Sequence, residues 1–145
     1  MEKTVFKNVT KQKLYDITLE SANSKDKEIY IFEKGNMGDL VGYEDAEKLR
    51  KVFLKNNIKV KQITNEENLI SFSDNKEFIE EVMSMRYVPQ NKFFIDYEIL
   101  IFDDIVAVYD TKELLVIKNE RYARIQKSVF MNYRNNGKEI SIDKK

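Results

Sequence analysis

Six acidic side chains lie within eighteen consecutive positions in the second half of the chain. They are Asp96, Glu98, Asp103, Asp104, Asp110 and Glu113. Carboxylates that converge can hold Mg²⁺ for phosphoryl transfer, which makes a metal-dependent enzyme or nuclease one hypothesis. Asp96 and Glu98 share one face of an expected strand, whereas Asp103 falls in a turn, where acidic residues are common. No lysine follows at the spacing of a nuclease, so a solvated acidic edge without a metal is the favoured interpretation.

One cationic and four aromatic side chains form a second candidate group. They are Arg86, Tyr87, Phe93, Phe94 and Tyr97. Aromatic rings stack on sugars and planar charged groups hydrogen-bond to hydroxyls, so this group is suited to a small-molecule effector such as a sugar. Aromatic residues make up 12% of the chain, so most of them must be core, and Arg86 has an ion pair with a nearby acid as its alternative role. Phe93 and Phe94 are the least core-like, because the loop before them is polar.

The composition excludes several kinds of chemistry. The 145 residues include no histidine and no cysteine, which removes thiolate catalysis, Cys/His zinc sites and Ser–His relays. Lys and Arg number 25 and Asp and Glu number 25, and this zero net charge argues against direct nucleic-acid binding. The basic residues Arg121, Arg124, Lys127 and Arg134 are therefore expected to form a solvated face. No apolar run predicts a membrane span or a signal peptide, so a cytoplasmic protein is expected.

Helix signals recur along the chain. Helices are expected over residues 11–24, 43–56, 74–85 and 120–135, with Thr10 and Asn119 as N-caps of the first and the last. A strand through residues 16–20 is the alternative to the first helix. In the second helix Leu49 and Phe53 belong to the apolar stripe, and Arg50 is expected to face water.

The expected strands complete a mixed architecture. They cover residues 28–32, 58–63, 85–89, 98–102, 105–109 and 113–117. Alternation of strands and helices predicts one α/β domain over residues 1–145, with helices on both faces of a mixed sheet. Residues from 1 to about 10 and from 138 to 145 are expected to be loosely held tails. The predicted core includes Phe78, Val82, Ile99, Ile101, Val106, Phe130 and Tyr133.

From Met85 onward the chain resembles the effector-sensing domain of TrmB-type transcription regulators. Four features carry the resemblance: Arg86-Tyr87-Val88-Pro89; two strands around an acidic turn from Ile99 to Ala107; Val116-Ile117-Lys118-Asn119; and Ala123, Gln126-Lys127, Phe130 and Tyr133 in the last helix. Tyrosine stands at this last position where tryptophan is usual. These sugar-responsive repressors have a sensing domain with a phospholipase-D-like fold, which is the fold that the resemblance implies. Their winged-helix DNA-binding domain does not precede this segment, so we expect a free-standing or excised sensor.

The resemblance also bears on catalysis. Phospholipase-D-type enzymes use a His-x-Lys-x4-Asp motif, and the same spacing here gives the degenerate positions Asp96, Glu98 and Asp103. Without the histidine nucleophile and the lysine cation, we expect no such activity and no cofactor. The expected function is a non-catalytic ligand-sensing or protein-interaction module, and a homodimer is the expected assembly. The alternatives are a metal-dependent phosphoryl-transfer enzyme using these acids and, third, a nucleic-acid accessory protein.

Overall fold

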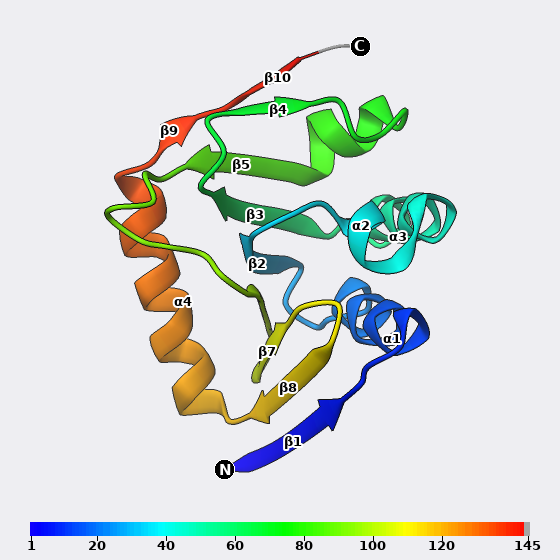
Figure 1. Cartoon of the computed structure of the whole chain (residues 1–145), viewed down its shortest axis with the longest axis vertical. Coiled ribbons are helices and arrows are strands. Elements are labelled where there is room, and N and C mark those ends of the chain that lie inside the picture. Colours follow the sequence, from blue (N-terminus) through cyan, green and yellow to red (C-terminus); the bar gives the residue numbers. More distant parts are fainter. Residues whose placement is uncertain (144–145) are drawn as a thin grey trace.

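A computed structural model describes residues 1–143 and centres on one mixed eight-stranded sheet (Figure 1). In spatial order its strands are β1 (Glu2–Lys7), β8 (Glu113–Lys118), β7 (Ile105–Tyr109), β6 (Glu98–Phe102), β2 (Glu28–Glu33), β3 (Lys59–Thr64), β5 (Met83–Tyr87) and β9 (Lys138–Glu139). The pairs β2–β3 and β3–β5 are parallel, and every other pair in this sheet is antiparallel. A separate parallel pair joins β4 (Asn68–Ile70) to β10 (Ser141–Asp143).

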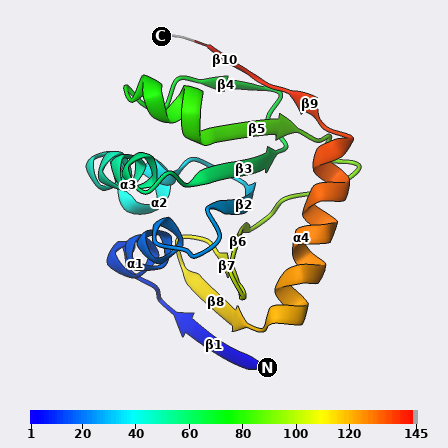
Figure 2. The same cartoon turned by 180° about the vertical axis from the view of Figure 1, so that it is seen from behind.

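Helices cover both faces of the sheet, as the sequence predicts. One face carries α1 (Lys11–Ala22), α2 (Met37–Val41), α3 (Tyr43–Lys55) and a single π-helical turn at Phe78–Val82, and α4 (Glu120–Asn135) crosses the other (Figure 2). None of these described helices is both long and apolar enough to span a membrane. The fold class of a mixed α/β sheet with helices on both faces is confirmed.

Local signals place the helices where they form. The Thr10 side chain accepts a hydrogen bond from the Lys13 backbone N–H at 3.1 Å, and the Asn119 side chain accepts one from the Tyr122 N–H at 2.8 Å. Both residues are extended N-caps that satisfy a free donor at the start of the helix. The helix over the first apolar repeat is therefore confirmed, and its strand alternative is wrong.

Strand alternation divides the core into two layers. In β2, Ile29 and Ile31 point toward α1–α3, whereas Phe32 points toward α4 and meets the Phe130 ring edge-on at 5.1 Å. Of the predicted core residues, Phe78, Val82, Ile101, Val106 and Phe130 are buried; Ile99 and Tyr133 are half-buried. Because the alternation continues to the end of β2, Glu33 lies on the same face as Ile31.

The helix expected over residues 74–85 is wrong in its last part, which forms a strand instead. The helical segment covers residues 76–82, with Phe78–Val82 as its π-helical turn, and β5 already begins at Met83. Met83 and Met85 are both buried, but as alternate residues of a strand whose register pairs Met83 with Val60 of β3. Parallel pairing satisfies the backbone of this segment, which outweighs the helical spacing of its apolar side chains.

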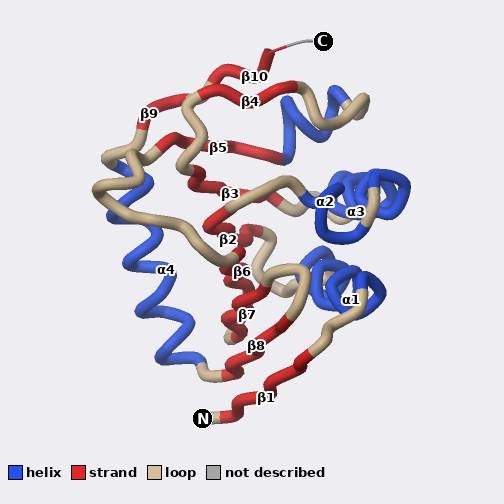
Figure 3. The backbone as a smooth tube through the Cα atoms, viewed as in Figure 1, coloured by secondary structure: helices blue, strands red, loops and turns tan. Residues whose placement is uncertain are grey.

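The expectation of loose chain ends is corrected by the structure. Residues 2–7 form β1, which pairs with β8 from Glu2↔Lys118 to Lys7↔Glu113. At the other end of the chain β9 pairs with β5 and β10 pairs with β4. Figure 3 shows β1 at one end of the molecule and β9 and β10 at the opposite end. Open sheet edges offer backbone partners to segments with little apolar character of their own. Residues 144 and 145 lie outside the described residues.

Candidate functional site

Two adjoining cavities open at the carboxyl ends of the parallel strands β2 and β3. The inner cavity has a volume of about 340 Å³ and the outer one about 860 Å³. They share Asn36, Asp39, Ile70 and Phe72 as lining residues, so they form one cleft. Open α/β sheets bind ligands in this position, outside the carboxyl ends of parallel strands. The cleft is therefore the candidate functional site.

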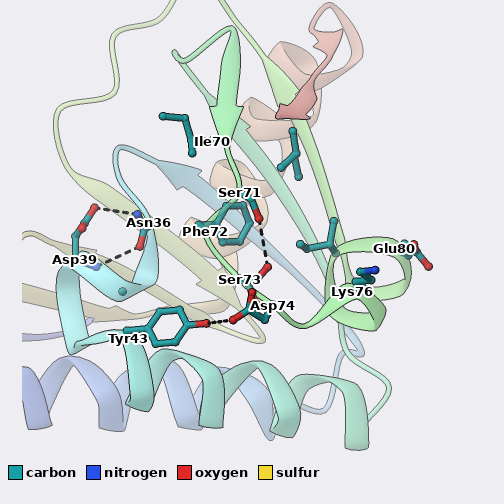
Figure 4. Close-up of a pocket in the computed structure, with 13 residues that line it drawn as sticks. Asn36, Asp39, Tyr43, Ile70, Ser71, Phe72, Ser73, Asp74, Lys76 and Glu80 are labelled. Atoms are coloured by element: carbon teal, nitrogen blue, oxygen red, sulfur yellow. Dashed lines mark hydrogen bonds between the residues drawn. The ribbon is translucent and has the colours of Figure 1, made fainter. Parts of the chain in front are cut away.

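The outer cavity lies between the start of α2, the start of α3 and the segment after β4 (Figure 4). The Tyr43 hydroxyl donates to Asp74 Oδ2 at 2.9 Å, which ties α3 to that segment. The Asn36 side chain accepts from the Asp39 backbone N–H at 3.2 Å and so caps α2. These bonds hold the rim of the cleft from three different parts of the chain.

Two carboxyl groups lie together beside the inner end of the cleft, around a small void of about 20 Å³. Glu33 ends β2 and Glu98 begins β6, and the antiparallel register Phe32↔Ile99 brings the two acids opposite each other. Glu98 is buried and accepts hydrogen bonds from the backbone N–H groups of Lys34 and Gly35. The sheet thus holds Glu98 in place, while Glu33 lines the cavity.

Two further polar side chains of the inner wall are almost completely buried. Gln62 of β3 is 5% exposed and Arg50 of α3 is 1% exposed. Gln62 Nε2 donates to Glu33 Oε1 at 3.3 Å, and Arg50 Nη1 donates to Glu47 Oε1 at 2.6 Å. Within residues 1–143, Gln62 Oε1 and Arg50 Nε have no hydrogen-bond partner. An unpaired buried polar atom costs roughly 1–3 kcal/mol, so a molecule in the cleft that paired with both atoms would gain from this wall.

The guanidinium of Arg50 is held by aromatic rings as well as by its ion pair. Its central carbon lies 5.1 Å from the centre of the Phe72 ring and 5.8 Å from that of the Phe78 ring. Glu47 in turn accepts a hydrogen bond from Ser73 Oγ at 2.7 Å. Ion pair and cation–π contacts fix the arginine in one orientation at the cavity wall.

Burial governs the charge state of the acid pair. Loss of solvation raises the pKa of Glu33 to about 7, against the opposing effects of Gln62 and Arg50. Loss of solvation and then the charge of Glu33 raise the pKa of Glu98 to about 8. Burial and the same two carboxylates also raise the pKa of Tyr109, which faces Glu98 across the β6–β7 ladder and stays neutral. The two acids therefore hold a proton between them near neutral pH.

The structure separates the three acids that the degenerate motif groups together. Glu98 lies beside Glu33, but Asp103 lies at the far end of β6, where its carboxylate accepts from the backbone N–H groups of Lys25 and Asp26. Asp96 is exposed and forms an ion pair with Lys34 at 3.3 Å. Among the described residues no group of three or more acids is placed to hold a metal ion. Asp96, Glu98 and Asp103 therefore do not converge on one metal site.

The remaining predicted acids serve turns or are exposed. The Asp110 carboxylate accepts from the backbone N–H groups of Lys112 and Glu113, and these bonds lower the pKa of Asp110 in spite of its partial burial. Asp103 has a φ of 50° and forms, with Asp104, the two-residue turn between β6 and β7. The tight hairpin expected at these two residues is confirmed.

Arg86 and Tyr87 lie away from the cleft, beside the end of α4. The Arg86 guanidinium donates to the Arg134 carbonyl at 3.1 Å, so it satisfies a free acceptor in the last turn of the helix. Tyr87 pairs with Lys138 in the β5–β9 ladder. Neither residue lines the cleft.

The three other aromatic candidates also do not meet around one cavity. Phe93 stacks on Phe32 at 5.0 Å and contacts Tyr133 at 4.5 Å, so it belongs to the core beneath α4. Phe94 is 60% exposed, and the Tyr97 hydroxyl donates to the Glu113 carboxylate. As a group, the five residues do not line the cleft. Whether they bind a sugar stays a prediction.

Sequence reasoning missed three residues of the inner wall: Glu33, Arg50 and Gln62. The expectation that Arg50 faces water is wrong, since it lies three positions before Phe53 and four after Ala46, on the buried stripe of α3. That spacing was a usable signal. The sequence gives no such signal for Glu33 and Gln62, because polar residues near the end of a strand are common.

Comparisons with known proteins show the fold. No protein-family model matches the chain, and no curated protein matches it. Among solved structures it is similar to Nuc from Salmonella typhimurium, a phospholipase D family member, with TM-score 0.64 and 13% identity over 97% of this chain and 99% of Nuc. NucT from Helicobacter pylori gives TM-score 0.62 and 16% identity over 96% and 99% of the two chains.

The third similar structure is TrmBL2, an archaeal chromatin protein described with a novel mode of DNA binding. Its TM-score is 0.62 at 18% identity, and the match covers 97% of this chain and 55% of TrmBL2. The chain thus spans about half the length of that protein. Together the three likenesses confirm the phospholipase-D-like fold that the resemblance to TrmB-type sensors implies.

Proposed function

We propose that this chain is a non-catalytic sensing module that binds a small polar molecule in the cleft at the ends of β2 and β3. One observation carries the proposal: Gln62 Oε1 and Arg50 Nε, both on deeply buried side chains of the cavity wall, have no partner within the described residues. Groups that are rigidly held, desolvated and unpaired gain most from a ligand that completes their hydrogen bonds.

The residues at the inner end support binding rather than phosphodiester chemistry. Phospholipase-D-type catalysis needs a histidine nucleophile, and the chain contains none. By spacing, Glu98 stands where the motif has its lysine, and its carboxyl group lies beside Glu33, which lines the inner cavity. Two acids there repel a phosphodiester where a cation would stabilise its charge. The fold is similar to that of Nuc and NucT, but the histidine and lysine of the catalytic motif are not present at these positions.

The proposal is tested by screening small polar molecules for binding with ligand-observed NMR. The panel contains neutral sugars and polyols, organic amines, and phosphorylated sugars. Gln62→Met removes the unpaired oxygen at nearly constant volume, and the exposed Gln90→Met is the matched control. We expect at least one class to bind the unmodified chain and Gln90→Met but to bind Gln62→Met at least tenfold more weakly. Equal binding to all three proteins would place the ligand elsewhere and refute the proposed site.

The non-catalytic part has its own test. A chromogenic phosphodiester is incubated with the protein in a chelator and, separately, with Mg²⁺ or Mn²⁺. We expect no turnover above background in any arm. Turnover that co-purifies with the protein and is lower in Glu98→Gln would refute the non-catalytic assignment. It would favour the phosphoryl-transfer alternative.

A further inference from the structure

We propose that the molecule bound in this cleft is a small organic amine, whose primary ammonium group lies against Glu33 and Gln62. This inference rests on the proposed function and narrows it to one chemical class of ligand. The class follows from which hydrogen-bonding atoms are free at the inner wall and from how the charges around them are already paired.

Two acceptors on residues that line the inner cavity have unused hydrogen-bonding capacity among the described residues. Gln62 Oε1 has no hydrogen-bond partner among the described residues, and Gln62 is only 5% exposed. Glu33 Oε1 accepts only from Gln62 Nε2, at the long distance of 3.3 Å, among the bonds within residues 1–143. A primary ammonium presents three donors and no acceptor, so it suits a site where an amide oxygen and a carboxylate lie side by side. The free donor Arg50 Nε then suits a hydroxyl or carbonyl oxygen elsewhere on the same ligand.

The cations already near the acid pair are engaged by other acids. Arg50 of α3 is paired with Glu47 at 2.6 Å, and Lys34, directly after β2, is paired with Asp96 at 3.3 Å. Glu33 therefore has no cation of its own among the ion pairs of the described residues. In a cavity of low dielectric constant, an ammonium beside this carboxylate gains more than it would in water.

The other groups that face the acid pair add negative or no charge. Asp39 of α2 and Glu66, between β3 and β4, line the same inner cavity. On the side of β7, Tyr109 is neutral, and the facing residue of α1 is Thr18, an uncharged side chain. The wall thus favours a cation and disfavours phosphates and carboxylates.

The acid pair also couples binding to protons. Burial raises the pKa of both carboxyl groups, so in the empty cleft near neutral pH the pair holds a proton. An ammonium stabilises the ionised form of Glu33, so its binding releases a proton, while the amine itself stays charged below about pH 9. The affinity for amines should therefore rise with pH, by up to about tenfold per pH unit while one full proton is released.

Matched pairs of probes isolate the charge of the ligand. We would measure calorimetric binding of 1,4-diaminobutane against 1,4-butanediol, and of glucosamine against glucose, at pH 6 and pH 8 with the full chain. We expect at least one amine to bind at least tenfold more tightly than its uncharged partner and at least fivefold more tightly at pH 8 than at pH 6. Heats in buffers of different ionisation enthalpy should show protons released on binding.

Two variants separate the site from general surface charge. Glu33→Gln keeps the hydrogen bond to Gln62 but removes the charge, so we expect at least tenfold weaker amine binding and loss of its pH dependence. Glu20→Gln removes an exposed charge on α1 and should leave both unchanged. Circular dichroism at each pH checks that both variants are folded. If Glu33→Gln were unfolded, Gln62→Met would be used in the same measurements.

The outcomes distinguish this inference from the proposed function. Sugars or diols that bind at the cleft as tightly as the amines would overturn the amine ligand but leave the sensing module standing. Amine binding that is insensitive to pH, or equally weakened by Glu20→Gln, would also overturn it. If no amine and no neutral probe showed binding that Gln62→Met weakens, both the amine ligand and the sensing module would be overturned.

Discussion

At the scale of single residues, the acid pair is the unusual feature of this molecule. Two carboxyl groups opposite each other in adjacent strands repel if both ionise. The backbone N–H groups of Lys34 and Gly35 hold Glu98, and Gln62 donates to Glu33. These bonds favour the ionised carboxylates, but burial outweighs them, so the pair keeps a proton. An acid pair held in this way beside the inner end of a cleft is a functional candidate rather than a stabilising one.

The pair predicts how stability depends on pH. The pKa values of Glu33 and Glu98 are raised in the folded state, to about 7 and about 8, from a usual value of 4.5. The folded state therefore binds more protons than the unfolded state between these limits, and stability contributed by the pair at low pH is lost as the pH rises through 7 to 8. The decline is at most about 1.4 kcal/mol per pH unit for each proton.

Urea denaturation at pH 5, 6, 7 and 8 measures this dependence. The free energy of unfolding of Glu33→Gln should fall less over this range than that of the unmodified chain, whereas Glu20→Gln should follow the unmodified chain. Parallel curves for Glu33→Gln and the unmodified chain would show that this carboxyl group does not titrate in the expected range.

At the scale of elements, β6 connects the candidate site to the core. It lies between β2 and β7, begins at Glu98 beside Glu33 and carries Ile101 into the layer beneath α4. Ile101 is 0% exposed. Shortening it leaves a cavity that a sheet paired on both sides cannot close.

Ile101→Ala is therefore expected to reduce the free energy of unfolding by about 2–5 kcal/mol. Ile125→Ala makes the same truncation on α4 at a side chain that is 58% exposed, and it should cost less than about 0.5 kcal/mol. Urea denaturation of both variants gives the comparison. A loss below about 1 kcal/mol for Ile101→Ala would contradict its place in the core.

The N-cap of α4 is a second test at this scale. Asn119 accepts from the Tyr122 N–H, so Asn119→Ala leaves that donor unpaired and should cost about 1 kcal/mol. Asn132→Ala changes an exposed residue within the same helix and should be neutral or slightly stabilising, because alanine favours helix. Equal effects of the two substitutions in thermal or urea unfolding would argue against the cap.

At the scale of the whole molecule, net charge predicts how strongly the chain binds DNA. Its 25 basic and 25 acidic residues give a zero formal net charge, so the long-range attraction to duplex DNA is small. The expected solvated face of the last helix is wrong for Arg134, which is buried and donates to the Gln62 and Ser84 carbonyls, and Lys127 donates to the Asp103 carbonyl.

We therefore expect binding to duplex DNA no tighter than about 10⁻⁴ M at physiological salt, in the non-specific range. Fluorescence anisotropy of a labelled duplex, repeated across salt concentrations, measures it. A micromolar complex that weakens steeply with salt would contradict the expectation and revive the nucleic-acid alternative.

Most helices and central strands were predictable, because their signals are local. The Thr10 and Asn119 caps, the apolar stripe around Leu49 and Phe53, and the alternation in β2 each depend on residues within a few positions of one another. Burial of Ile101 and Phe130 followed from the same patterns, and motifs in the last 60 residues carried the resemblance that implied the fold.

Only the tertiary structure decided the site. Glu33, Arg50, Gln62 and Glu98 come from four elements, and strand order and register bring them together, while the length of β6 keeps Asp103 away from Glu98. The same holds for β1, β9 and β10, whose backbones pair with sheet edges that are distant in sequence. Local sequence determines which way a side chain points from its own element, but pairing between distant segments depends on the free energy of the whole packed sheet. A site built across strands is therefore set by that packing.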